Sequence, residues 1–175
     1  MSSARCAQGG YSLIEVLVSV TILMIGLLGL AGLQAASLRW TADAGQQAAA
    51  ARLAQELAEM IRAQPGEIDR YVAGAAGSPS VDPACYGSGG CPVAARIATD
   101  LAEWRAQVAA ALPGGFATVC RDATPADGSI ASPDCTGGAL DPVVLKFWWA
   151  ARDTRGRSTE ASTLSAPVTV LPLRP

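Results

Sequence analysis

An unbroken apolar run near the N-terminus constrains this chain more than any other feature. Residues 13–33 read LIEVLVSVTILMIGLLGLAGL, with a single ionisable side chain, Glu15. A helix of this length rises about 30 Å, which is the thickness of the hydrocarbon core of a bilayer. We therefore expect a transmembrane helix, with the bulk of the chain on one side of the membrane.

The segment before the run, MSSARCAQGG, differs from a secretory signal peptide. A signal peptide has a shorter apolar stretch of about 7–15 residues and a small-residue cleavage site after it. Here the small residues Gly9 and Gly10 precede the apolar run, and the segment carries one positive charge, Arg5. Positive charge favours the cytoplasmic side, so the remainder of the chain is expected outside the cytoplasm.

Glu15 sharpens the functional interpretation. An acidic group in an apolar membrane helix costs a few kcal/mol near the bilayer centre and marks a functional residue. Cleavage after Gly10 would leave a positively charged amine at Tyr11, about one helical turn from Glu15. In a filament of such helices, this amine and a neighbour's Glu15 would neutralise each other. The alternative is a simple signal anchor whose Glu15 side chain reaches the interface.

The string GGYSLIEVLVS resembles the cleavage and methylation signature of type IV prepilins. That signature has a glycine before the cut, an aromatic residue after it and a glutamate five residues in; the family usually has Phe where this chain has Tyr11. The resemblance implies that a prepilin peptidase removes residues 1–10 and methylates the new N-terminus at Tyr11. It also implies that Glu15 guides assembly.

The helical pattern continues beyond the apolar run and becomes amphipathic until Pro65 and Gly66 end it. We expect one helix of roughly 80 Å, transmembrane over residues 11–35 and amphipathic over residues 36–64. In the second half, Leu53, Leu57, Met60 and Ile61 recur at helical spacing. Glycines at intervals of three in the first half are typical of close packing against another helix.

Residues 65–175 are expected to form a globular head. Residues 74–92 are rich in Gly, Ser and Pro and predict a loop. A second helix follows, with Pro92 in its first turn and Trp104 on its apolar, core-facing stripe. Strands are expected at residues 116–120, 143–151 and 164–171, with a turn at 153–156. The fold class is α+β: a long N-terminal helix packed on a small antiparallel β-sheet head, the ladle shape that pilins share.

The order of these pieces resembles the type IV pilus modification proteins of the PilV type. In those proteins an L-x-x-W helix leads into L-P-G-G and a later hydrophobic strand contains Trp, as residues 101–104, 112–115 and 143–149 do here. The resemblance implies a minor pilin that helps to prime the type IV pilus and is incorporated in it, supporting twitching motility and adhesion. A minor pseudopilin of a type II secretion system, which shares E-V-L-V, is the alternative.

The same resemblance implies partners and a location. The partners are other minor pilins, the major pilin, the prepilin peptidase and the inner-membrane assembly platform. The protein is expected in the inner membrane with its head in the periplasm, and then in the pilus at the cell surface. A membrane-anchored binding module that never polymerises would keep the anchor and need no cut after Gly10.

Four cysteines remain once Cys6 leaves with the leader. An even number facing an oxidising compartment favours disulfides, for which three pairings are conceivable. Local closure favours Cys85–Cys91 and Cys120–Cys135. The alternative is a zinc site with four thiolates, although the spacings differ from the usual two to four intervening residues.

The strand at residues 143–149 places a tryptophan on its second face. Alternation puts Val143, Leu145, Phe147 and Trp149 on the core face, and Val144, Lys146 and Trp148 on the other. An exposed Trp148 beside Lys146 is a candidate contact for another pilin. The alternative is partial burial of Trp148 under the loop at residues 121–139.

The composition argues against an enzyme. The chain has no His, which removes the commonest general base and metal ligand, and it has neither G-x-S-x-G nor a Gly-rich phosphate loop. The formal net charge of -2 gives no basic field for nucleic acid. We expect a structural and assembly protein with no cofactor, no metal and no specific nucleic-acid partner.

Overall fold

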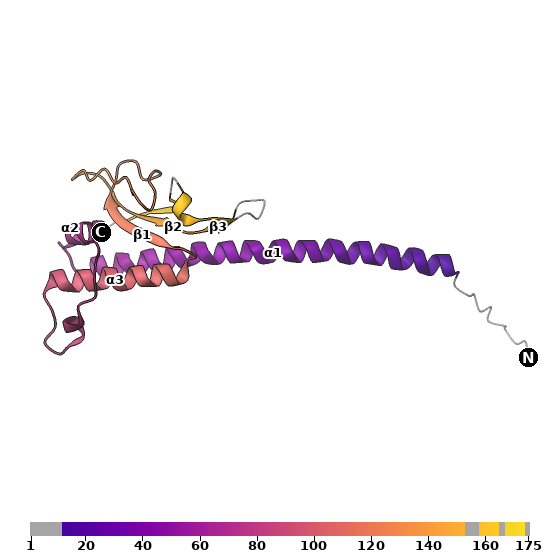
Figure 1. The fold of residues 1–175 in the computed structure, drawn as a ribbon, viewed down its shortest axis with the longest axis horizontal. Helices are drawn as coiled ribbons and strands as arrows, with labels where there is room; N and C mark the ends of the chain where they lie inside the picture. The colour runs from indigo at the N-terminus through magenta and orange to yellow at the C-terminus, as the bar shows by residue number, and fades with distance from the viewer. Residues whose placement is uncertain (1–11, 153–157, 165–166, 174–175) are drawn as a thin grey trace, which may run out of the picture. The chain divides into compact units, whose positions relative to one another are not determined.

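The computed structural model describes residues 12–152, 158–164 and 167–173 (Figure 1). The chain divides into two compact units, one up to Ala42 and one from Asp43 onward. Its elements, in order, are α1 (Leu13–Arg62), α2 (Ile68–Ala76), the 3-10 helix η1 (Pro83–Tyr86), α3 (Val93–Ala111), β1 (Phe116–Arg121), β2 (Val143–Trp148), β3 (Ala151–Arg152), β4 (Ser158–Thr159), the 3-10 helix η2 (Ala161–Thr163) and β5 (Thr169–Pro172).

The second unit contains a three-stranded antiparallel sheet in the order β1-β2-β5. Cys120 pairs with Val144 between β1 and β2, and Leu145 pairs with Leu171 between β2 and β5. All six residues of the central strand β2 are buried. The short strands β3 and β4 form a separate antiparallel pair.

The core of this unit joins the second half of α1 and the helix α3 to the sheet. Figure 1 shows α3 beside that half of α1. Trp104 of α3 is fully buried, its indole Nε1 donates to the carbonyl of Leu53 at 2.8 Å, and its ring meets Phe147 edge-on at 5.9 Å. The prediction that Trp104 is a core residue is confirmed, and so is the α+β fold with a long N-terminal helix packed on a small antiparallel sheet.

The expected loop at residues 74–92 is wrong at its start, because α2 extends to Ala76. Tyr71 and Ala75 are buried one turn apart on one face of α2. Gly74, interpreted from the sequence as a loop residue, is a packing residue: a Cβ there would lie 2.9 Å from Leu101 Cδ1 of α3. A glycine therefore lets the two helices approach closely, and η1 adds a further short turn within the same segment.

The expected strand at residues 116–120 is present as β1, whereas the other two are shorter than expected. The 143–151 strand ends at Trp148, because the N–H of Ala150 donates to the carbonyl of Pro113 at 2.8 Å instead of continuing the ladder. The 164–171 strand is wrong at Leu164, Pro167 and Val168, and residues 165 and 166 lie outside the described residues. It begins only at Thr169, after η2 and after Pro167, which has no N–H to donate. The expected turn at 153–156 lies outside the described residues.

Trp104→Phe should lower the free energy of unfolding of the head by about 1–3 kcal/mol. The substitution removes the indole N–H that bonds to Leu53 and leaves a small void in a filled core. Urea denaturation of the detergent-solubilised chain, followed by circular dichroism, measures this loss. Trp40→Phe is the matched control: Trp40 is 73% exposed, so the same substitution should change stability by less than about 0.5 kcal/mol. Equal effects of the two substitutions would contradict the packing described.

Candidate functional site

The first functional feature is the surface of α1 within the first unit. Its large apolar side chains are all exposed, and 0% of the most apolar stretch of the helix is buried. The helix is long and apolar enough to cross a membrane. A helix also satisfies its own backbone hydrogen bonds, which hydrocarbon requires of a spanning segment. This surface therefore needs either lipid or the apolar helices of other subunits around it.

Glu15 lies in the first turn of this helix, where its N–H donates to the carbonyl of Ser12 at 3.0 Å. One turn later, the Ser19 hydroxyl donates to the Glu15 carbonyl at 2.7 Å. The Ser19 hydroxyl is thus hydrogen-bonded within its own helix. The carboxylate of Glu15 is the charged group on this apolar surface. Gly10 and Tyr11, the expected processing residues, lie outside the described residues.

The apolar half of α1 also carries the three regularly spaced glycines noted in the sequence, Gly26, Gly29 and Gly32. A Cβ built at any of the three would meet no atom within 4 Å. No contact inside the described part of the chain accounts for a glycine at these positions. Because these three residues have no side chain, another helix can approach this face of α1 closely.

Two disulfides close two loops of the head. Cys85–Cys91 has its Cα atoms 4.7 Å apart and closes the loop that contains η1. Cys120–Cys135 has its Cα atoms 6.1 Å apart and joins the end of β1 to the segment after it. Asp122 lies within 4.8 Å of the second pair of sulfurs. Because those sulfurs are bonded to each other, they are not the thiolates that a metal ion requires.

Lys146 fastens the loop enclosed by the second disulfide, residues 121–134, to the sheet. It comes from the central strand β2, and neither its side chain nor that of Asp122, with which it forms an ion pair, is exposed to solvent. Its Nζ also donates to the carbonyl of Pro133 at 2.8 Å and to the carbonyl of Asp127 at 3.1 Å. The charge is therefore surrounded by acceptors from a single loop, as a buried ammonium requires.

Asp122 is held in its charged form within this site. Burial alone would raise its pKa, but hydrogen bonds from Lys146 and from the N–H of Thr124, at 2.9 Å, hold the pKa below its ordinary value. The sequence analysis missed this ion pair. The signal that could have found it is a lone lysine inside the most apolar strand of the head, between Leu145 and Phe147.

The prediction of an exposed Trp148 is wrong, and the alternative of burial under the loop holds. Trp148 has 0% of its surface exposed, its Nε1 donates to the carbonyl of Gly128 at 3.3 Å, and its ring packs on Phe116. Gly128 adopts φ 92°, and a Cβ there would lie 2.4 Å from the Pro133 carbonyl oxygen, so the loop needs a glycine at this point. Trp148 is consequently a core residue of the head and is unavailable as a surface contact.

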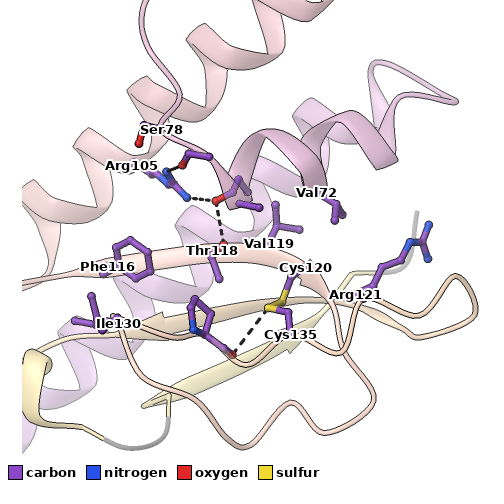
Figure 2. A pocket seen from close by; sticks show the side chains of 16 residues that line it. Val72, Ser78, Arg105, Phe116, Thr118, Val119, Cys120, Arg121, Ile130 and Cys135 are labelled. Atoms are coloured by element: carbon purple, nitrogen blue, oxygen red, sulfur yellow. Dashed lines mark hydrogen bonds between the residues drawn. A yellow bond between two sulfur atoms is a disulfide. The ribbon is translucent and has the colours of Figure 1, made fainter.

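A cavity of about 570 Å³ lies between α2, β1 and the same loop, with the Cys120–Cys135 disulfide in its wall (Figure 2). Arg105 of α3 donates through its two terminal nitrogens to the carbonyls of Ala75 and Gly77, and its guanidinium lies 5.6 Å from the centre of the Phe116 ring. These bonds satisfy carbonyls at the C-terminal end of α2. Arg105 therefore fastens α2 to α3.

Lys146→Met should lower the free energy of unfolding by about 3–5 kcal/mol, because it leaves the carboxylate of Asp122 buried without its cation. Urea denaturation of the detergent-solubilised chain measures the loss. Lys146→Met combined with Asp122→Leu should cost clearly less than the sum of the two single substitutions.

The contribution of Asp122 to the free energy of unfolding depends on pH in a defined direction. Because the pKa of Asp122 is depressed in the folded state, the stability it contributes is present above about pH 4, the ordinary carboxyl pKa, and is lost as the pH falls through the lower folded value. The difference in stability between the wild type and Asp122→Asn should therefore shrink only below about pH 4. If the losses of the Lys146→Met and Asp122→Leu substitutions simply added in the double variant, the two side chains would not form a charged pair. A stability difference between the wild type and Asp122→Asn that grows on acidification would contradict the pair as well.

Two protein-family models match parts of this chain. A family model described as type IV pilin Tt1218 matches residues 32–104, and a model of the prokaryotic N-terminal methylation motif matches residues 5–31. No curated protein and no solved structure matches the chain. The two matches adjoin, and together they cover the leader motif, the exposed apolar helix and the helical part of the head. Proteins of this family are structural and not enzymes. The two matches support a type IV pilin.

Proposed function

We propose that this chain is a minor type IV pilin of the PilV type, which helps to prime assembly of the pilus and is then incorporated in it. It supports twitching motility and adhesion through that role. A pilin with a prepilin leader motif is processed by a prepilin peptidase and assembles with other pilins. The proposal adds the minor role and names the partners: other minor pilins, the major pilin and the inner-membrane assembly platform.

One observation carries the proposal: the apolar half of α1 is exposed along its whole length and bears a single carboxylate, Glu15, in its first turn. Such a helix is stable in a bilayer, and it can also pack among the apolar helices of other pilins. A protein that only needed an anchor would gain nothing from a buried charge. A protein that leaves the membrane for a filament gains a defined position relative to its neighbour.

The leader supplies the partner for that charge. Cleavage after Gly10 and methylation of Tyr11 create a positively charged N-terminus next to the Glu15 carboxylate of a neighbouring subunit. Burying either charge alone costs several kcal/mol, whereas the pair offsets most of that cost. The single positive charge of the leader, Arg5, supports a cytoplasmic leader and a periplasmic head in the inner membrane.

The head provides a rigid surface for contacts with other subunits. Its loop at residues 121–134 is held covalently by the Cys120–Cys135 disulfide and electrostatically by Lys146. Both devices limit the conformational entropy that the loop would otherwise lose on binding a partner. A head of this kind suits a subunit that is placed at a specific position in an assembly and then exposed at the cell surface.

A minor pseudopilin of a type II secretion system is the second candidate, because E-V-L-V at residues 15–18 and the exposed helix suit that assembly equally. The two functions differ in what fails when the chain is deleted. A pilin mutant loses surface pili and twitching, whereas a pseudopilin mutant retains pili and fails to release its secreted substrates. Normal pili in normal numbers after deletion would contradict the proposal.

Glu15→Val, expressed in the deletion strain, should be processed normally and yet fail to restore pili. Without the carboxylate, the neighbouring N-terminal amine is buried unpaired, at a cost of about 3–5 kcal/mol. A cost of this size lowers the assembly equilibrium by more than about a hundredfold, so we expect a fall of about tenfold or more in surface pili. Counting pili by electron microscopy and measuring twitching zones test this expectation.

Ser19→Ala is the matched control, because it removes a polar group one turn along the same helix whose hydroxyl is already bonded to the Glu15 carbonyl. It should restore pili to the wild-type number. Full restoration by Glu15→Val would show that the carboxylate plays no part in assembly. Blots of the membrane fraction establish that both variants are expressed and processed equally.

A further inference from the structure

Beyond its apolar run, α1 carries an isolated tryptophan on open helix surface. Trp40 is 73% exposed, Leu38 is equally exposed, and Arg39 lies between them. The three other tryptophans of the chain, Trp104, Trp148 and Trp149, are buried in the head. Nothing in the first unit covers the Trp40 ring, although so large an apolar side chain is costly to leave in water.

The position of Trp40 along the helix indicates what covers it. It follows Leu33, the last residue of the apolar run, by about 10 Å of helix. The distance from Leu13 to Trp40 is about 40 Å, which matches a bilayer measured with its polar headgroup layers. With residues 13–40 centred in the bilayer, Trp40 and Arg39 lie about 20 Å from the midplane, in the headgroup layer on the side of the head.

The chemistry of this segment suits that layer. Tryptophan is enriched at membrane interfaces because its ring is apolar while its indole N–H is a hydrogen-bond donor. The guanidinium of Arg39 complements lipid phosphate, and its aliphatic stem can lie along the acyl chains. Polar residues follow at once, among them Thr41 and Asp43, so the helix leaves the interface directly after Trp40.

We propose that Leu38, Arg39 and Trp40 form an interfacial anchor that binds the phospholipid headgroup layer and sets the depth of α1 in the membrane. The proposal rests on the membrane-spanning role of α1 in the function proposed above. Its consequence concerns the opposite end of the helix, because Glu15 lies about 38 Å from Trp40. An anchor at Trp40 therefore holds Glu15 at the opposite headgroup layer.

The test uses the fluorescence of the full chain in vesicles of phosphatidylethanolamine and phosphatidylglycerol. The difference between the wild type and Trp40→Phe isolates the emission of Trp40 from that of the three buried tryptophans. The vesicles contain lipids brominated either close to the headgroup or near the end of the acyl chain, since bromine quenches tryptophan only at short range. We expect the Trp40 emission to be blue-shifted relative to water and to lose more intensity with the shallow bromine than with the deep one.

A second variant separates the anchor from the membrane span itself. Leu23→Trp in the Trp40→Phe background places the reporter in the middle of the apolar run, where the deep bromine should quench it most. If this reporter is quenched and Trp40 is unquenched with a water-like emission, the anchor is overturned while the span stands. If neither reporter is quenched, the span fails, and the anchor and the proposed function fail with it.

Two further results would also overturn the anchor. Stronger quenching of Trp40 by the deep bromine would place the ring in the hydrocarbon instead of the headgroup layer. A Trp40 emission that is water-like in vesicles and blue-shifted only in purified filaments would make the ring a contact between subunits.

Discussion

The exposed apolar surface of the first half of α1 determines which environments this protein can occupy. Fourteen large apolar side chains between Leu13 and Leu33 are exposed, and each contributes about 1.5–3 kcal/mol when it leaves water. The total is of the order of tens of kcal/mol, several times the stability of a typical domain. No part of the described chain covers this surface. The helix must therefore be in lipid or among other helices at every stage, and transfer between these two environments is what a pilin does.

The head must fold stably in water although its sheet is small. Both faces of the central strand β2 are buried. The second half of α1 and α3 cover one face, with Trp104 bonded to Leu53 across the two helices. The loop closed by Cys120–Cys135 covers the other face, and Lys146 is the cation that binds it there. A covalent bond and a buried ion pair thus compensate for a sheet of only three strands.

The sequence was most informative where a pattern repeats over many residues. The long helix is encoded by continuous apolar and then amphipathic periodicity, and the burial of Trp104 follows from its place on a regular stripe. Local patterns were less reliable. Gly74 is a loop signal by composition, yet it lies in α2 because Leu101 of the neighbouring helix requires the space. Only the tertiary contact distinguishes these two uses of glycine.

Trp148 and Lys146 show a second limit. Alternation in a strand identifies which residues share a face, and it assigned the core face of β2 correctly. It does not report whether a loop covers the other face, because loop placement depends on contacts distant in sequence. The sequence therefore left exposure and burial of Trp148 open, whereas the structure buries both Trp148 and Lys146 under this loop.

Processing of the N-terminus is the step on which assembly of this chain into a filament depends. The direct measurement is the intact mass and N-terminal sequence of the protein from membranes, with and without the prepilin peptidase. We expect a chain that starts at Tyr11 and carries one methyl group, and that keeps residues 1–10 when the peptidase is absent. An unprocessed N-terminus in the presence of the peptidase would contradict this expectation, because Glu15 would then have no free amine to neutralise.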